Sequence, residues 1–223
     1  LFIVGNLLGL VDMGNGNNYV YLGCDLEAGS HIFTGSGDDT IYLGGAIYDN
    51  VDAGAGDDVV IMTDKSSCWG WWGVSVNGGD GLDTLNLDGY KGKLDLSTLV
   101  FSPSMSDGIN GFEVLDLGAA DGSGVGTDNV LNINVGPKNM NIDTLLDDYL
   151  LSVGDEHLAA LLTGDASAVL RVNGDLGDKV TLDGMWKAYD GGTSVTYDNI
   201  TYSVYYNNQA SDTELLLIQQ GLL

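Results

Sequence analysis

The sequence reads Gly35-Ser36-Gly37-Asp38-Asp39-Thr40-Ile41, and close copies of this stretch follow twice along the chain. The copies are Gly54-Ala55-Gly56-Asp57-Asp58-Val59-Val60 and Gly78-Gly79-Asp80-Gly81-Leu82-Asp83-Thr84-Leu85. Each fits the nonapeptide G-G-x-G-x-D-x-U-x, in which U is a large apolar residue. A weaker copy, Gly14-Asn15-Gly16-Asn17-Asn18-Tyr19-Val20, has Asn18 in the place of the Asp. Several copies in one register predict an all-β chain with a right-handed parallel β-roll, rather than a set of ordinary Gly/Asp turns.

The spacing of the copies indicates the size of each turn of the roll. The equivalent glycines are Gly14, Gly35, Gly54 and Gly79. Their separations are 21, 19 and 25 residues. Two ideal nonapeptides take about 18 residues, so each excess is a small insertion. Degenerate half-repeats ending at residues 30–33 and 49–52 are expected on the opposite edge, so the roll covers residues 1–90.

The apolar slot of each repeat is expected to point inward, because side chains alternate between the two faces of a strand. Stacked turns then place these side chains one above another in a thin core. The residues expected in this row are Val11, Val20, Ile32, Ile41, Val51, Val60 and Leu85.

The turn of each repeat has the composition of a cation site. Glycine permits positive φ, which lets successive carbonyl oxygens face one point, and the Asp in position six adds a carboxylate. An ion between two successive turns would meet two carboxylates and about four carbonyls, an all-oxygen shell suited to Ca²⁺. Mg²⁺ fits less well, because it keeps its waters and demands a tight octahedron. The sequence therefore predicts several Ca²⁺ ions.

The best predicted site lies between the turns of Asp39 and Asp58. The pair Asn18 and Asp39 comes next, followed by Asp58 and Asp83, which a long insertion separates. The full set of candidate metal ligands is Gly14, Gly16, Asn18, Gly35, Gly37, Asp39, Asp49, Gly54, Gly56, Asp58, Gly79, Gly81 and Asp83.

Other acidic residues in the repeats are expected to matter less. Ser30 and Asp49 are candidates for a weaker site on the opposite edge, whereas Asp38 and Asp57 are expected to be solvated at outward positions. A Gly/Asp-rich β-protein without metal is the alternative for the whole region. It is disfavoured because aspartates stacked at every turn would repel one another without a cation.

Composition excludes several classes of function. The chain has 223 residues, with 32 acidic and 7 basic ones, and a formal net charge of -25. Such a charge disfavours binding to nucleic acid and to anionic membranes. No apolar run reaches transmembrane length. Cys24 and Cys68 are expected to be free buried thiols, and the first residues, Leu1-Phe2-Ile3-Val4, are expected to be a strand of a longer secreted array.

Catalytic motifs are missing from the sequence, so the chain is predicted not to be an enzyme. His31 and His157 are the only histidines, which excludes the zinc motif H-E-x-x-H. Gly73-Val74-Ser75-Val76-Asn77 lacks the last glycine of the G-x-S-x-G elbow. The cluster Trp69-Gly70-Trp71-Trp72 is expected to close the open side of the roll, with stacking on a surface glycan as the alternative.

The second half is predicted to continue and cap the roll, over residues 91–168 and 169–223. Strands are expected at 111–117, 129–135, 169–172, 179–182, 195–197, 200–206 and 214–218. Apolar residues at helical spacing predict short helices at 142–151 and 155–162. In the strand 200–206, Ile200, Tyr202, Val204 and Tyr206 are expected to share one face.

Several segments resemble the C-terminal end of large RTX adhesins. These are the nonapeptides, residues 111–117, residues 170–182, the pair Met185-Trp186, a Tyr-rich hairpin and residues 215–220. The resemblance implies a bacterial surface protein that carries an uncleaved C-terminal signal for type I secretion machinery, follows the rest of a long adhesin chain and is secreted. Folding would then await millimolar Ca²⁺ outside the cell. The alternative is the non-catalytic tail of a secreted enzyme or toxin.

Overall fold

The computed structural model describes residues 1–63, 74–89, 93–95, 108–119, 128–133, 166–197, 199–209 and 212–223. In this part of the chain the regular structure is β-strand, apart from one 3-10 turn over Tyr189–Gly191. The prediction of an all-β chain with parallel sheets is confirmed. The helices predicted at 142–151 and 155–162 lie outside the described residues, as do Cys68 and the Trp69–Trp72 cluster.

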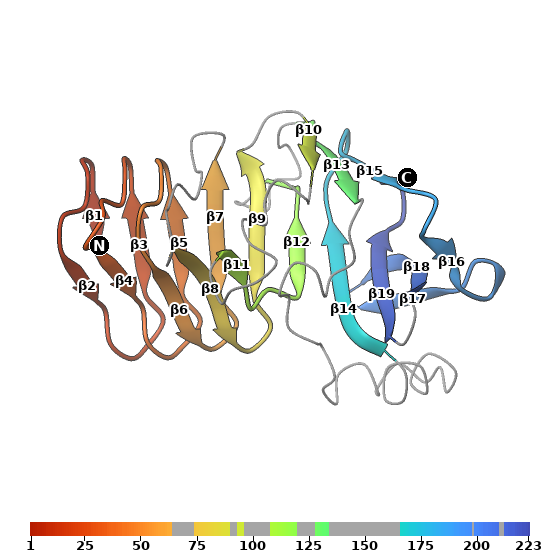
Figure 1. The fold of residues 1–223 in the computed structure, drawn as a ribbon, viewed down its shortest axis with the longest axis horizontal. Coiled ribbons are helices and arrows are strands. Elements are labelled where there is room, and N and C mark those ends of the chain that lie inside the picture. Colours follow the sequence, from red (N-terminus) through yellow and green to blue (C-terminus); the bar gives the residue numbers. More distant parts are fainter. Residues whose placement is uncertain are drawn as a thin grey trace.

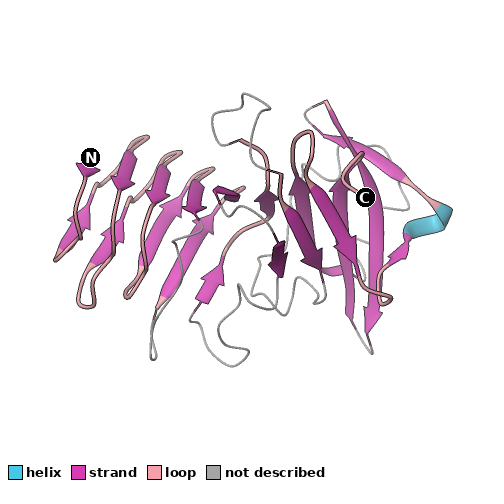
Figure 2. Ribbon diagram, turned by 90° about the horizontal axis from the view of Figure 1, so that it is seen from above, coloured by secondary structure: helices cyan, strands magenta, loops and turns pink. Residues whose placement is uncertain are grey.

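The first half of the chain alternates between two parallel sheets (Figure 1). One sheet contains β1 (Phe2–Ile3), β3 (Tyr19–Leu22), β5 (Thr40–Leu43), β7 (Val59–Thr63) and β9 (Thr84–Gly89). The other contains β2 (Leu10–Asp12), β4 (His31–Phe33), β6 (Val51–Ala55), β8 (Ser75–Asp80) and β11 (Gly108–Asn110). Because successive strands lie in different sheets, neighbours within a sheet come from successive turns of the chain. Figure 2 shows these turns side by side.

The strands pair in register, turn upon turn. In the first sheet Val20 lies opposite Ile41, Ile41 opposite Val60, and Val60 opposite Leu85. Equal positions of the repeat therefore stack, which is what the nonapeptide pattern predicts. The residues predicted to point inward are confirmed as buried members of one core: Val11, Val20, Ile32, Ile41, Val51, Val60 and Leu85.

The first sheet continues into the C-terminal part of the chain. Its further strands, in sheet order, are β12 (Val114–Asp116), β14 (Ala166–Asn173), β19 (Asp212–Gln219), β18 (Ile200–Gln209) and β16 (Lys187–Ala188), and β17 (Ser194–Tyr197) pairs with β18. A third, parallel sheet contains β10 (Lys93–Asp95), β13 (Val130–Ile133) and β15 (Lys179–Leu182). Pairing is parallel as far as β19 and antiparallel beyond it. The predicted boundaries after residues 90 and 168 stay a prediction.

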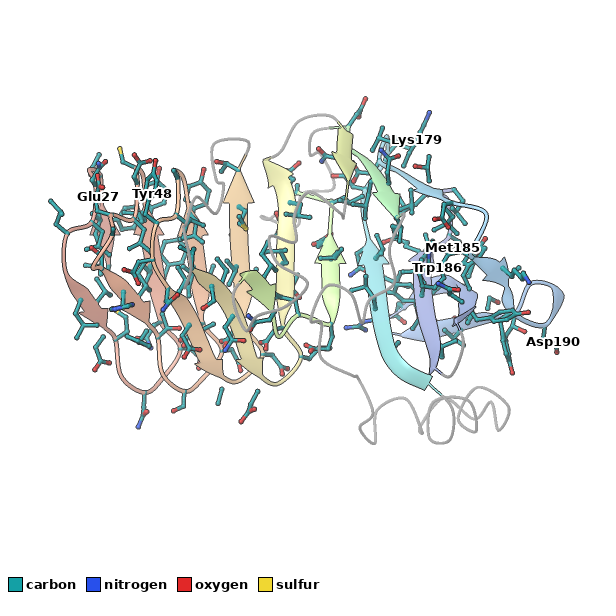
Figure 3. The ribbon with its side chains drawn as sticks, viewed as in Figure 1. Glu27, Tyr48, Lys179, Met185, Trp186 and Asp190 are labelled. Atoms are coloured by element: carbon teal, nitrogen blue, oxygen red, sulfur yellow. The ribbon has the colours of Figure 1, made fainter. Side chains whose placement is uncertain are left out.

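Side chains of the C-terminal strands divide between two cores. The face predicted for Ile200, Tyr202, Val204 and Tyr206 is confirmed, since Tyr202 and Val204 are buried in a small second core and Ile200 and Tyr206 pack against it. Trp186 packs into the main core with 6% of its surface exposed, next to the partly exposed Met185 (Figure 3).

One strand is shorter than the pattern predicts. Alternation suggested a strand over 111–117, but β12 begins at Val114. Gly111 has φ +66°, which bends the backbone into a turn just before the strand. Glu113 therefore lies at the end of a turn, with only 2% of its surface exposed.

Candidate metal centre

The glycine-rich turns stack so closely that their first glycines have no room for a side chain. Gly54 lies in register with Gly79. A Cβ added at Gly35, Gly54 or Gly79 would lie 2.1, 2.0 or 1.9 Å from the carbonyl oxygen of the equivalent glycine one turn earlier. The φ angles of these glycines are +99°, +108° and +117°. The equivalence of Gly14, Gly35, Gly54 and Gly79 is thus confirmed, and the turns present their carbonyl oxygens to one another.

The second glycines of the motif stack in the same way. Gly37, Gly56 and Gly81 have φ angles of +111°, +133° and +141°. A Cβ at Gly81 would lie 2.1 Å from the carbonyl oxygen of Gly56, and a Cβ at Gly37 would lie 2.8 Å from the carbonyl carbon of Gly16. Both glycines are therefore required by close backbone contact in the second, third and fourth turns, whereas Gly14 and Gly16 of the first turn have nothing within 4 Å.

The position-six acids form a column of buried carboxylates, which we call the inner column. Oδ1 of Asp39 accepts a hydrogen bond from the backbone amide of Asn18 at 2.6 Å. Oδ1 of Asp58 accepts one from the amide of Asp39 at 2.7 Å, and Oδ1 of Asp83 accepts one from the amide of Asp58 at 2.8 Å. Each carboxylate thus binds the backbone of the preceding turn.

The second oxygen of each of these carboxylates has no such bond. Oδ2 of Asp39, Asp58 and Asp83 is buried and has no hydrogen-bond partner in the described part of the chain. The three side chains are 1%, 1% and 0% exposed. A buried carboxylate oxygen without a partner is costly, so these atoms mark places where a cation would compensate charge.

The environment of the inner column disfavours ionised carboxylates in the absence of a cation. Burial raises the pKa of Asp58 to about 6 and that of Asp83 to about 8. Backbone hydrogen bonds lower both pKa values, and the charges of neighbouring acids, Asp39 for Asp58 and Glu113 for Asp83, raise them further. The column therefore has the electrostatics of a cation site.

Asn18 brings a nitrogen, not an oxygen, to the first turn. Its Nδ2 donates to the carbonyl oxygens of Gly16 at 2.5 Å, Thr34 at 3.1 Å and Gly14 at 3.3 Å. Carbonyls of two successive turns thus converge on one point, where an amide group provides the positive end of a dipole. The pairing of Asn18 with Asp39 as metal ligands stays a prediction, and in this structure the Asn18 amide donates to these carbonyls.

The outward acids form a separate column. Asp38 and Asp57 are exposed, as predicted. Their Oδ1 atoms accept hydrogen bonds from the following turn, Asp38 from the amide of Asp57 at 3.2 Å and Asp57 from the amide of Leu82 at 3.1 Å. They stabilise the stacking of the turns from the solvent side.

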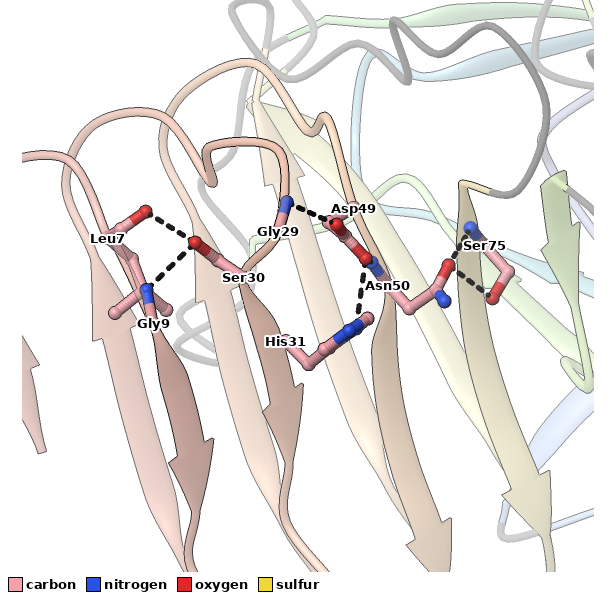
Figure 4. A network of polar contacts seen from close by, with 8 residues as sticks. All are labelled: Leu7, Gly9, Gly29, Ser30, His31, Asp49, Asn50 and Ser75. Carbon is pink, nitrogen blue, oxygen red and sulfur yellow. Dashed lines mark hydrogen bonds and ion pairs between the residues drawn. The ribbon is translucent and has the colours of Figure 1, made fainter.

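The residues predicted for a weaker site on the opposite edge are hydrogen-bonded within the protein (Figure 4). Asp49 Oδ1 lies 2.9 Å from His31 Nδ1, and Asp49 Oδ2 accepts from the amide of Gly29 at 2.6 Å. Ser30 Oγ donates to the carbonyl of Leu7 at 3.1 Å. Both carboxylate oxygens of Asp49 have partners within the protein. Each aspartate of the inner column has one oxygen without a partner among the described residues, so Asp49 is the weaker candidate ligand.

Two acidic residues outside the repeats, Glu113 and Asp178, are also buried. Glu113 extends the inner column by one turn, since its Oε2 accepts from the amide of Asp83 at 2.8 Å. The sequence contains one signal for this position. Glu113-Val114-Leu115 has an acid two residues before an apolar residue, as in the D-x-U part of the nonapeptide, but the glycines of the motif are missing. Burial raises the pKa of Asp178, but both its oxygens accept backbone hydrogen bonds at 2.8 Å.

The donor set of the inner column is an oxygen-only one. No group of three or more His, Cys, Asp or Glu side chains among the described residues is arranged to hold a metal ion. The predicted shell needs only two such side chains, because backbone carbonyls supply the remaining oxygens. Carboxylate oxygens that are buried without a partner among the described residues, on turns whose glycines stack, fit a hard divalent cation.

Cys24 is a free cysteine whose thiol donates to the carbonyl of Val4 at 3.3 Å. Within the described residues, no helix is long and apolar enough to cross a membrane. Comparison of the chain with protein-family models, with curated proteins and with solved structures finds no match.

Proposed function

We propose that the chain is a calcium-binding, right-handed parallel β-roll with a β-rich C-terminal cap, and that Ca²⁺ ions lie between its stacked turns. One observation carries this proposal. Asp39, Asp58 and Asp83 stack in register, each uses one oxygen to bind the neighbouring turn, and each has a second buried oxygen without a partner in the described part of the chain. A divalent cation between two turns would meet two carboxylates, and Asp58 is shared by two such junctions.

Calcium is favoured over other ions by the ligands available. Carboxylate and carbonyl oxygens suit hard cations, whereas zinc and copper prefer nitrogen and sulfur ligands. A shell of several backbone carbonyls on a glycine-rich turn accommodates Ca²⁺, which accepts six to eight ligands at flexible angles. Mg²⁺ would have to give up waters that it holds tightly.

We further propose that calcium binding switches folding of the chain. A net charge of -25 and the buried acids of the inner column oppose folding when calcium is scarce, as in a bacterial cytoplasm. At the millimolar Ca²⁺ found outside cells, the free energy of binding becomes free energy of folding. A chain with this behaviour stays unfolded during export and folds on arrival.

The biological role that fits this behaviour is a non-catalytic folding and type I secretion module of a bacterial surface adhesin. The support is the likeness of residues 170–182 and 215–220 to the secretion-signal end of RTX adhesins. Under this proposal the partners are the type I secretion machinery and the rest of the adhesin chain, and the protein acts at the cell surface. A catalytic domain encoded upstream would assign the chain instead to a secreted enzyme or toxin.

Circular dichroism of the purified chain tests the switch. We expect β-structure to be low in chelator and to rise cooperatively as Ca²⁺ reaches the millimolar range. Mg²⁺ at equal concentration serves as the control for ionic strength and divalent charge, and is expected to have little effect. The same β-content in chelator and in calcium would contradict the switch.

An export assay tests the proposed role in secretion. The chain is fused behind a reporter and expressed with a type I exporter, and reporter in the medium is measured. A fusion that ends at residue 165 is the control, since it lacks β14 to β19. We expect the full fusion to be exported and the shortened one to be retained, and equal export of both would contradict the assignment.

A further inference from the structure

The turn at residues 111–113 stacks on the last glycine-rich turn and brings Glu113 into line with Asp83. Strand β11 pairs in parallel with β8 on one side of the turn. On the other side, Val114 of β12 lies opposite Thr84 of β9. Glu113 therefore has the position in its own turn that Asp83 has in the turn before.

Glu113 also makes the contact that defines the inner column. Its Oε2 accepts a hydrogen bond of 2.8 Å from the backbone amide of Asp83. Asp83 Oδ1 accepts an equal bond of 2.8 Å from the amide of Asp58. With 2% of its surface exposed, Glu113 is as deeply buried as the aspartates. The inner column thus has a fourth carboxylate that the nonapeptide pattern does not show.

The junction between the two turns contains an oxygen that lacks a partner and a closely placed backbone carbonyl. Asp83 is 0% exposed, and its Oδ2 has no hydrogen-bond partner within the described residues. A Cβ added at Gly78 would lie 1.9 Å from the carbonyl oxygen of Gly111, so this oxygen projects toward the preceding turn. Oxygens of two turns are therefore available at one junction.

The turn at residues 111–113 is shorter than the glycine-rich turns, and its glutamate side chain is longer than the aspartate of those turns. Four residues separate Gly78 from Asp83, whereas Phe112 alone separates Gly111 from Glu113. The shorter backbone offers fewer carbonyls, and Phe112 is buried in the apolar core. The additional methylene of Glu113 lets its carboxylate reach the junction all the same. A site built this way has fewer protein ligands and leaves more positions for water.

We propose that Asp83 and Glu113 hold a further Ca²⁺ ion, with the carbonyl oxygen of Gly111 as a third ligand. This site rests on the calcium-binding function proposed above. It is the last cation site of the inner column. Val114 pairs with Arg171 of β14, so the position next to Glu113 is Leu170, which is apolar and has no carboxylate. Its affinity for Ca²⁺ is lower than that of the Asp39–Asp58 site, since it has fewer carbonyl ligands.

Calorimetric titration of the full chain with Ca²⁺ tests the site. We expect Glu113→Gln to bind one ion fewer than the unchanged chain while the tighter sites keep their affinity. Glu27→Gln is the matched control, because Glu27 lies on the opposite edge, where its Oε1 accepts from Asn6 Nδ2 at 2.5 Å. It should bind as many ions as the unchanged chain. An equal ion count in Glu113→Gln would overturn the inference and leave the proposed function standing, whereas no binding by the unchanged chain would refute the function itself.

A second variant covers the case in which Glu113→Gln fails to fold. Glu113→Asp keeps the charge but withdraws the carboxylate by one methylene, so we expect one site alone to weaken by about tenfold. Tb³⁺ luminescence lifetimes report the number of waters on each bound ion. The decay component of the ion with the most bound waters should be absent in Glu113→Gln. In Glu113→Asp its amplitude should be reduced. Unchanged isotherms and lifetimes in the Asp variant would overturn the inference.

Discussion

The backbone amide of Asp39 donates a hydrogen bond of 2.7 Å to Oδ1 of Asp58, and Oδ2 of Asp58 stays buried without a partner in the described part of the chain. The carboxylate thus divides its two oxygens between two tasks. One oxygen holds the neighbouring turn in place, and the other is available to a cation. Cation binding and stacking of the turns are therefore linked through the same side chain, which is why we expect calcium to control folding.

Removal of one inner carboxylate should weaken calcium binding. In Asp58→Asn the two junctions that share Asp58 each lose half of their carboxylate charge, so we expect about a 10- to 100-fold loss of calcium affinity. Asp57→Asn is the control, because it removes the same charge from the adjacent, exposed position. Titration calorimetry compares the variants, and equal losses in both would indicate a general charge effect without inner sites.

The calcium-free chain should be more stable at pH 5 than at pH 8. The pKa of Asp58 is about 6 and that of Asp83 about 8 in the folded chain, against an ordinary value of 3.8. Folding therefore favours the protonated form of both carboxyl groups. Their contribution to the stability of the fold is fully present below about pH 3.8 and is lost as the pH rises through about 6 for Asp58 and about 8 for Asp83. Circular dichroism in chelator at several pH values measures this loss, as a β-content that falls from pH 5 to pH 8.

The Asp83→Asn variant is a control for the pH dependence of stability in chelator. In Asp83→Asn the loss of stability above pH 6 should disappear, while the loss near pH 6 from Asp58 should persist. Stability that rises with pH in chelator would contradict the burial of these carboxylates.

Asn18→Asp should create an additional calcium site. The Asn18 amide donates to carbonyls of Gly14, Gly16 and Thr34, which belong to two successive turns. An aspartate cannot donate to these carbonyls, so carbonyls and carboxylate together would require a cation. Calorimetry should count one more ion than in the unchanged chain. A variant that folds in calcium with an unchanged ion count would show that the first turn cannot accommodate one.

Substitution of a stacked glycine should be more costly than substitution of an unstacked one. In Gly54→Ala the Cβ would lie 2.0 Å from the carbonyl oxygen of Gly35, in addition to the strain of φ +108°. We expect a loss of about 2–4 kcal/mol in the free energy of unfolding in calcium. Gly16→Ala has a similar φ of +99° but nothing within 4 Å, so its loss should be about 1–2 kcal/mol. Denaturant unfolding in saturating calcium measures both, and equal losses would exclude a role for close stacking.

The regular features of the fold could be predicted from the sequence because they repeat. Period-two alternation placed Val20, Ile41 and Val60 in the core, and the glycine spacing aligned the turns across insertions of different length. The same register aligned Asp39 with Asp58, whereas their burial is a finding of the structure. A repeat fixes these features because one local rule acts at every turn.

The irregular features depend on distances that no pattern expresses. Glu113 joins the inner column through strand pairing across a long insertion, and its turn lacks the motif glycines. The orientation of the Asn18 amide and the contact of Asp49 with His31 depend on side-chain geometry across turns. Such contacts join residues about 20 positions apart, as in the Asn18–Asp39 bond with a separation of 21.

The most direct test of the account is a crystal structure of the calcium-saturated chain with anomalous scattering measured for calcium. We predict an anomalous peak between the turns of Asp39 and Asp58, with carboxylate oxygens of both residues and turn carbonyls about 2.3–2.6 Å from it. A calcium-saturated crystal without a peak at this junction, in which Oδ2 of both aspartates is bonded only to protein or water, would contradict the central claim.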